Sequence, residues 1–230
     1  LNGTFVVQVR DTFTMDVVDS IGFSKDFSSF MTRKVKFVRT FNQNNPDGYI
    51  WRISAMTPLV GFSGDKVSLS SLNIFSVNAS TDSINGITVE EGNQLFSLNS
   101  SEIGDLFLDR DNLPTFDAFQ HIMLKIAVEN NDPEYALDSV GVGEWVINRY
   151  GRSRYQRGRG KLNDKGIGVD EILNDNIHAG LWRVHGPGLG QESRIFRSFF
   201  SIIDLATIFT EDGGYNCYIL SIPYKVTRPN

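Results

Sequence analysis

The feature that most limits how this chain can fold is the alternation of apolar and polar residues in its opening segment. Between residues 4 and 18, one face carries the apolar residues Phe5, Val7, Val9, Phe13, Met15 and Val17, interrupted by Asp11. The other face is polar, apart from Val6 and Val18. Because successive side chains of a strand point to opposite faces, this pattern predicts one long, half-buried strand over residues 4–18.

Shorter segments of the same kind follow along the chain. They predict strands over residues 32–41, 49–57, 67–77, 84–89, 119–128, 180–185, 194–203 and 215–226. In the first of these segments we expect Val35 and Phe37 to point inward, and in the last we expect Tyr218, Leu220, Ile222, Tyr224 and Val226 to share one face. Residues 21–31, with phenylalanines at 23, 27 and 30, predict one or two helical turns. Turns are predicted at 42–48 and 212–214, and an irregular loop at 186–190.

These elements favour an all-β fold. The chain shows no regular alternation of strands with helices, which argues against a parallel α/β fold, and no repeat that would indicate a propeller or solenoid. With 40% apolar residues it has enough side chains for a core, and no apolar run is long enough to predict a membrane-spanning helix. We predict a single domain over residues 1–230, an antiparallel β-sandwich of the eight-stranded jelly-roll type with long loops and little helix.

A basic stretch at residues 149–165 stands out against an acidic chain. It holds seven Lys/Arg and one acid, about +6, whereas the whole chain carries −5. Like charges repel, and Gly151, Gly158 and Gly160 disfavour regular structure, so we expect an exposed loop. Arginine with interleaved tyrosine and glycine can contact phosphate and stack on bases. The candidate nucleic-acid-binding residues are Arg149, Arg152, Arg154, Tyr155, Arg157, Arg159 and Lys161, and the alternative is a solvated loop that binds nothing.

Candidates for catalysis are few. Cys217 falls within an apolar strand, which favours a packed thiol, and a single cysteine cannot form an internal disulfide. His121 also falls in a predicted strand, and His178 and His185 have only Asp175 near them in sequence, so no zinc site is predicted. No nucleophile elbow or phosphate-binding loop occurs, and the glycines at 186–190 lack the spacing of a dinucleotide fingerprint. The chain is therefore predicted not to be an enzyme and to need no cofactor or metal.

A binding module is the main alternative that the residues leave open. Trp51, Trp145 and Trp182 are candidates for a sugar platform, although they suit a core or an interface equally well. Asp105, Asp109, Asp111 and Asn112 lack the oxygen spacing of a calcium loop and are better explained as solvated acids. A sugar-cleaving enzyme would need a carboxylate pair, and Glu90 and Glu91 are adjacent and would point to opposite faces of a strand.

The two ends of the chain resemble the single-jelly-roll capsid proteins of small circular single-stranded-DNA viruses. The resemblance lies in the opening strand, in the run Met31-Thr-Arg-Lys-Val-Lys-Phe-Val-Arg39, and in the closing run Gly214-Tyr-Asn-Cys-Tyr-Ile-Leu-Ser-Ile-Pro-Tyr-Lys-Val-Thr-Arg-Pro229. It covers about a fifth of the chain, and the middle resembles no family.

This resemblance implies a subunit that assembles with sixty or more copies of itself into an icosahedral shell, through its long loops. It implies a packaged nucleic acid, expected to be single-stranded, no membrane insertion, and a location in the virion and, during assembly, in the host cell. Such proteins commonly carry an Arg-rich arm before the first strand, which this sequence does not contain. The basic stretch would then face the genome or a neighbouring subunit.

Overall fold

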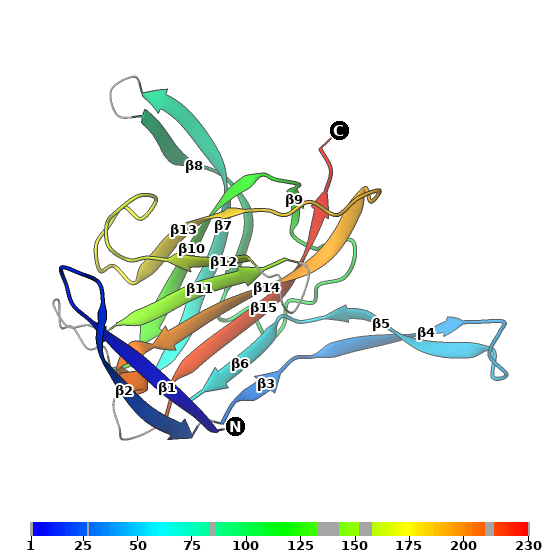
Figure 1. The fold of residues 1–230 in the computed structure, drawn as a ribbon. Helices are drawn as coiled ribbons and strands as arrows, with labels where there is room; N and C mark the ends of the chain where they lie inside the picture. Colours follow the sequence, from blue (N-terminus) through cyan, green and yellow to red (C-terminus); the bar gives the residue numbers. More distant parts are fainter. Residues whose placement is uncertain are drawn as a thin grey trace.

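The computed structural model describes residues 2–26, 28–82, 86–132, 143–151, 158–209 and 214–229. Within them the chain is almost entirely extended (Figure 1). The strands are β1 Asn2–Arg10, β2 Val17–Asp26, β3 Phe30–Thr32, β4 Val35–Phe41, β5 Tyr49–Met56, β6 Leu59–Ser63, β7 Val67–Asp82, β8 Gly86–Asn99, β9 Thr115–Asp117, β10 His121–Asn130, β11 Glu144–Tyr150, β12 Gly158–Leu162, β13 Ile177–Arg183, β14 Ser193–Asp204 and β15 Cys217–Thr227. One short helix, α1 Leu205–Phe209, follows β14, and no described helix is long and apolar enough to cross a membrane.

Two sheets form the body of the molecule. The smaller has the strand order β13-β10-β7-β8, and the larger has the order β12-β11-β14-β15-β6-β3, with β9 added parallel to β15. All other pairings are antiparallel, which confirms the predicted all-β sandwich; its assignment as a jelly roll stays a prediction.

The core lies between these two sheets, because both contribute alternate residues to one cluster. The smaller sheet supplies residues such as Leu72, Ile126 and Trp182, and the larger supplies residues such as Phe200 and Tyr224. The predicted inward face of the last strand is confirmed: Tyr218 packs against the cluster, and Leu220, Ile222, Tyr224 and Val226 are fully buried.

The first predicted strand is two strands. β1 and β2 form an antiparallel hairpin, and the turn between them begins at Asp11, the residue that interrupts the apolar pattern. Its carboxylate accepts the N–H groups of Phe13 and Thr14, both at 2.8 Å, which stabilises a turn. Residues 21–31 were also predicted wrongly as helical, because most of them belong to β2 and β3.

Strands β4 and β5 leave the body as a long ribbon that projects to one side (Figure 1). The turn predicted at residues 42–48 is at its tip, where the N–H of Asn42 donates to the carbonyl of Gly48. At its base, Met56 pairs with Leu108, and Lys34 forms an ion pair with Asp105. The prediction that Phe37 points inward is wrong, because this ribbon has no second layer and Phe37 is 56% exposed.

Candidate nucleic-acid interface

The described part of the basic stretch lies mostly in two strands rather than in a loop. Arg149 lies in β11, Arg159 and Lys161 lie in β12, and the two strands pair as a hairpin. The predicted residues Arg152, Arg154, Tyr155 and Arg157 lie outside the described residues.

Gly158 lies in a strand, not in a loop, and packing explains why a glycine is needed there. A Cβ added to Gly158 would come within 2.6 Å of the Tyr150 ring. The missing side chain lets that ring lie over the core, 5.0 Å from the centroid of Trp182. Burial raises the pKa of Tyr150. Tyr150 is therefore a packing residue, not a flat surface among the arginines.

The register of the hairpin places the three described cations on one face of the larger sheet. Arg149 is opposite Arg159, and Ile147 is opposite Lys161. Residues opposite each other in an antiparallel pair share a face. The neighbouring residues Val146 and Leu162 point into the core, so the cations lie on the opposite side, which we call the outer face.

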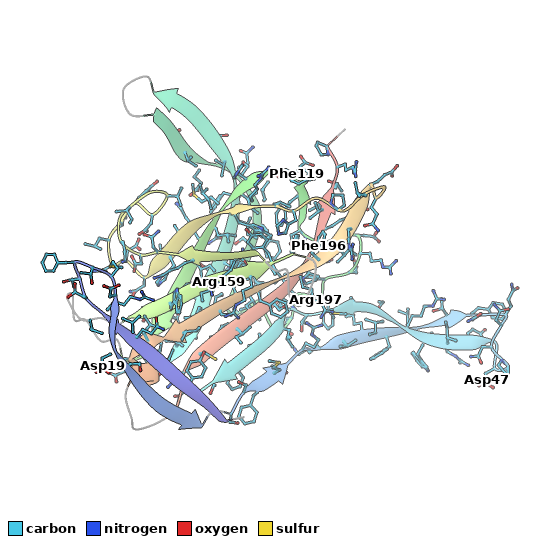
Figure 2. The ribbon with its side chains drawn as sticks, viewed as in Figure 1. Asp19, Asp47, Phe119, Arg159, Phe196 and Arg197 are labelled. Carbon is cyan, nitrogen blue, oxygen red and sulfur yellow. The ribbon has the colours of Figure 1, made fainter. Side chains whose placement is uncertain are left out.

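Arg197 and Lys225 extend this basic outer face, and sequence reasoning missed both. Arg197 is on β14, where Phe196 and Phe200 point into the core, and Lys225 is on β15 between the buried Tyr224 and Val226. In Figure 2, Arg159 lies over the part of the sheet near β11, and Arg197 lies closer to the base of the ribbon. The signal was present in the sequence, because Arg197 alternates with the apolar residues of its strand.

The outer face is mostly basic. The outer-face positions of β11, β12, β14 and β15 include five basic residues, and none of the described residues at these positions is acidic. The basic residues are Arg149, Arg159, Lys161, Arg197 and Lys225. The neighbouring strand β9 adds one acid to this face, Asp117, which is opposite Thr227 and accepts its hydroxyl at 3.3 Å. Five cations against one acid give the described part of this face a positive charge that attracts anions.

Local contacts orient two of these cations and leave them able to bind an anion. Arg149 donates from Nη1 to the hydroxyl of Ser201 at 3.4 Å, and Lys161 Nζ lies 5.5 Å from the ring centroid of Trp145. Partial burial, followed by the charge of Lys165, lowers the pKa of Lys161. At the base of the ribbon, partial burial and then the charge of Arg197 lower the pKa of Arg33. A bound phosphate would relieve both repulsions.

The other candidates from the sequence are dispersed. Cys217 is 3% exposed, and burial raises the pKa of its thiol, as expected for a packed cysteine. His178 is buried in β13, whereas His121 is exposed at the start of β10. Trp182 is in the core, and Trp51 is 69% exposed on the ribbon, so the tryptophans form no common platform.

The acids around residue 109 organise their own loop. Asp109 accepts the N–H groups of Asp111 and Asn112 at 2.9 and 3.0 Å, and the Asn112 side chain accepts the N–H of Asp109. A closer cluster, which the sequence did not indicate, joins Asp164, Asp170 and Asp175, whose carboxylate oxygens lie within 4.8 Å of one another. These groups also accept backbone N–H bonds, from Gly166 to Asp170 at 2.7 Å and from Asn176 to Asp164 at 3.0 Å.

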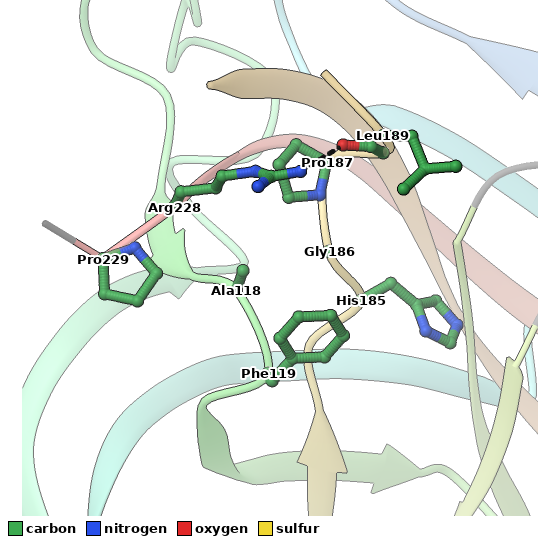
Figure 3. A pocket seen from close by; sticks show the side chains of 9 residues that line it. Ala118, Phe119, His185, Gly186, Pro187, Leu189, Arg228 and Pro229 are labelled. Carbon is green, nitrogen blue, oxygen red and sulfur yellow. Dashed lines mark hydrogen bonds between the residues drawn. The ribbon is translucent and has the colours of Figure 1, made fainter. Parts of the chain in front are cut away.

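The loop at residues 186–190 borders an open groove of about 690 Å³ (Figure 3). Arg228 holds its shape by donating to the carbonyl of Gly188 at 2.8 Å. A Cβ on Gly186 would come within 2.8 Å of the Phe119 ring, so glycine is needed there for close packing. The predicted irregular loop is confirmed: Gly186 serves packing, whereas Gly188 and Gly190 adopt positive φ angles.

Comparison with known proteins assigns no family to this chain. No protein-family model matches it, and a search of curated proteins finds no match.

Proposed function

We propose that this chain is a viral capsid protein, a subunit that assembles with copies of itself into an icosahedral shell and packages nucleic acid. The observation that carries the proposal is the outer face of the larger sheet, where the described strands β9, β11, β12, β14 and β15 gather five cations and one acid in a chain of net charge −5. An acidic protein gains little from concentrating cations on one surface unless that surface meets an anion. A phosphate backbone is an anion of the required extent.

Two further features agree with a shell subunit. The projecting β4–β5 ribbon exposes aromatic side chains that the body does not cover, as expected of a surface that meets another molecule. The resemblance of the two ends of the chain to single-jelly-roll capsid proteins points the same way. A sugar-binding module receives less support, because its three tryptophans are dispersed.

The salt dependence of nucleic-acid binding tests this proposal. We expect the triple variant Arg149→Ser, Arg159→Ser, Arg197→Ser to bind single-stranded DNA more weakly and with a flatter salt dependence. Each lost phosphate contact on a single strand removes about 0.7 from the slope of log affinity against log salt, so three contacts remove about 2. The affinity is measured by fluorescence anisotropy from low to physiological salt.

The control changes net charge equally at other places. Arg10, Arg110 and Arg183 lie away from the outer-face positions, and replacing all three with serine should leave the slope nearly unchanged. Equal losses of slope in the two triple variants would show that only net charge matters and would contradict the proposed interface. A third variant, with serine at Arg152, Arg154 and Arg157, measures how much of the salt dependence comes from the part of the basic stretch that lies outside the described residues.

A further inference from the structure

One face of the β4–β5 ribbon is apolar and is not covered by any of the described residues. In the register of the ribbon, Phe37 is opposite Ile53, Arg39 is opposite Trp51, and Phe41 is opposite Tyr49. These six side chains therefore share one face, which we call the ribbon face. Its five apolar members are between 45% and 69% exposed. The single cation, Arg39, lies 4.3 Å from the ring centroid of Tyr49.

Leaving the apolar ribbon face exposed to water is unfavourable in free energy. A two-stranded ribbon is marginally stable alone and normally packs one face on a second layer. Large aromatic side chains bury about 150–250 Å² each, so five large apolar side chains, each about half exposed, offer roughly 500 Å². Standard interfaces take about 800 Å² from each partner, so this face and its flanking residues supply most of one interface.

A complementary surface lies in the loop at residues 164–176, which we call the acidic loop. It carries four acids and one lysine, a net charge of −3, whereas residues 35–56 of the ribbon carry three cations and one acid, a net charge of +2. The acidic loop also exposes large aliphatic side chains: Ile167 and Ile172 are each 60% exposed, and Leu173 is 59% exposed. Of the three cations, Arg39 lies on the ribbon face, and Lys36 and Arg52 lie on the other face of the same ribbon. Apolar groups therefore match on the two surfaces, and the ribbon and the loop carry opposite net charges.

Contacts within the acidic loop order it before any partner binds. Lys165 and Leu173 pair as a β-bridge across it, and Asp170 accepts the N–H of Gly166 at 2.7 Å. A surface that is ordered before binding loses little entropy when a partner arrives.

The two surfaces belong to opposite sides of one molecule. Figure 1 shows the ribbon projecting on the right of the body and the acidic loop, between β12 and β13, on the left. The ribbon therefore cannot reach the acidic loop of its own chain. Stacking two ribbon faces instead would bring two basic ribbons together, which their charge disfavours.

We propose that the ribbon face of one copy packs on the acidic loop of a second copy, in a head-to-tail contact. This inference rests on the proposed self-assembly and names the two surfaces that carry it. A head-to-tail contact leaves a free ribbon on one partner and a free acidic loop on the other, so further copies can join until a ring or shell closes.

Crosslinking between two singly labelled proteins tests the contact directly. Ile53→Cys and Ile172→Cys proteins are prepared in a Cys217→Ser background, mixed in equal amounts under assembly conditions, and treated with a short bis-maleimide. We expect a crosslinked species containing one copy of each protein, identified by mass spectrometry. The matched control is Val38→Cys, which lies on the opposite face of the same ribbon and is 45% exposed, and it should crosslink to Ile172→Cys several-fold less.

Other outcomes overturn the inference without overturning the proposed function. If particles form but position 53 links only to position 53, the ribbons pair with each other; if it links to neither, the ribbon meets another surface. If the unmodified protein forms no particles at all, the proposed function itself fails.

A matched pair of substitutions gives a second, independent test. We expect Ile53→Ser to raise the protein concentration needed for half-maximal assembly by about tenfold or more, as loss of a central interface anchor does. Val38→Ser, which removes an exposed apolar side chain from the other face, should change it less than about twofold. Equal effects of the two substitutions would contradict a contact made by the ribbon face.

Discussion

At the scale of single residues, His178 is a buried side chain whose ring nitrogens are not hydrogen-bonded within the described structure. It is 5% exposed. Burial lowers its pKa, although the charges of Glu144, Asp170 and Asp175 act in the opposite direction and Lys161 adds to the lowering. The neutral imidazole is therefore the form that the fold accepts.

This predicts a loss of stability in mild acid. The unfolded chain binds a proton at His178 near the ordinary pKa of about 6.5, whereas the folded chain binds it only at lower pH, so the free energy of unfolding falls as pH falls below about 6.5. A His178→Gln variant, which cannot be protonated, should show a shallower loss between about pH 7.5 and 5.5. Urea unfolding at each pH measures this, and parallel curves for the two proteins would contradict it.

Residue-scale predictions from the sequence succeeded where the pattern was local. The buried thiol of Cys217 and the core residues of the last strand followed from alternation alone. The role of Gly158 did not follow, and neither did the presence of Arg197 on the same face as Arg149, because these depend on Tyr150 and on strand pairings that only the folded chain forms. The acidic cluster was missed for the same reason: Asp164, Asp170 and Asp175 are apart in sequence and meet only when their loop closes.

At the scale of elements, the ribbon is the segment whose pattern misleads. The strands and the turn at its tip were predicted nearly at their observed positions, but alternation cannot say whether an apolar face meets the core or projects from it. The opening hairpin was predicted as a single strand because the alternation of apolar and polar residues continues on both sides of Asp11, across the turn.

Excising the ribbon should separate assembly from folding. Replacing residues 38–52 by Asn-Gly joins Phe37 to Ile53, which are already opposite each other, through a tight hairpin turn. Because the core cluster contains no residue of β4 or the excised part of β5, we expect the thermal midpoint to stay within about 3 °C of the parent, the shift that about 1 kcal/mol causes. Assembly should be lost. Calorimetry measures the midpoint. A large drop would show that the ribbon stabilises the two packed sheets.

At the scale of the whole molecule, the fold class was the most predictable property. Alternating segments without intervening helices leave few architectures besides stacked antiparallel sheets, and two such sheets enclose one core here. The order of strands within each sheet was not predictable, since it depends on pairings between segments far apart in sequence. One such pairing is that of β11 with β14, and it places Arg149 and Arg197 on the same sheet.

The particle mass in solution tests the central proposal most directly. A closed shell of sixty copies of this 25.8 kDa chain would have a protein mass of about 1.5 MDa, and larger shells would be multiples of it. We predict a particle of at least this size by light scattering or mass photometry of the full-length protein at near-neutral pH with nucleic acid present. A monomer or dimer across a range of salt, pH and protein concentration would contradict the proposal that this chain builds a shell.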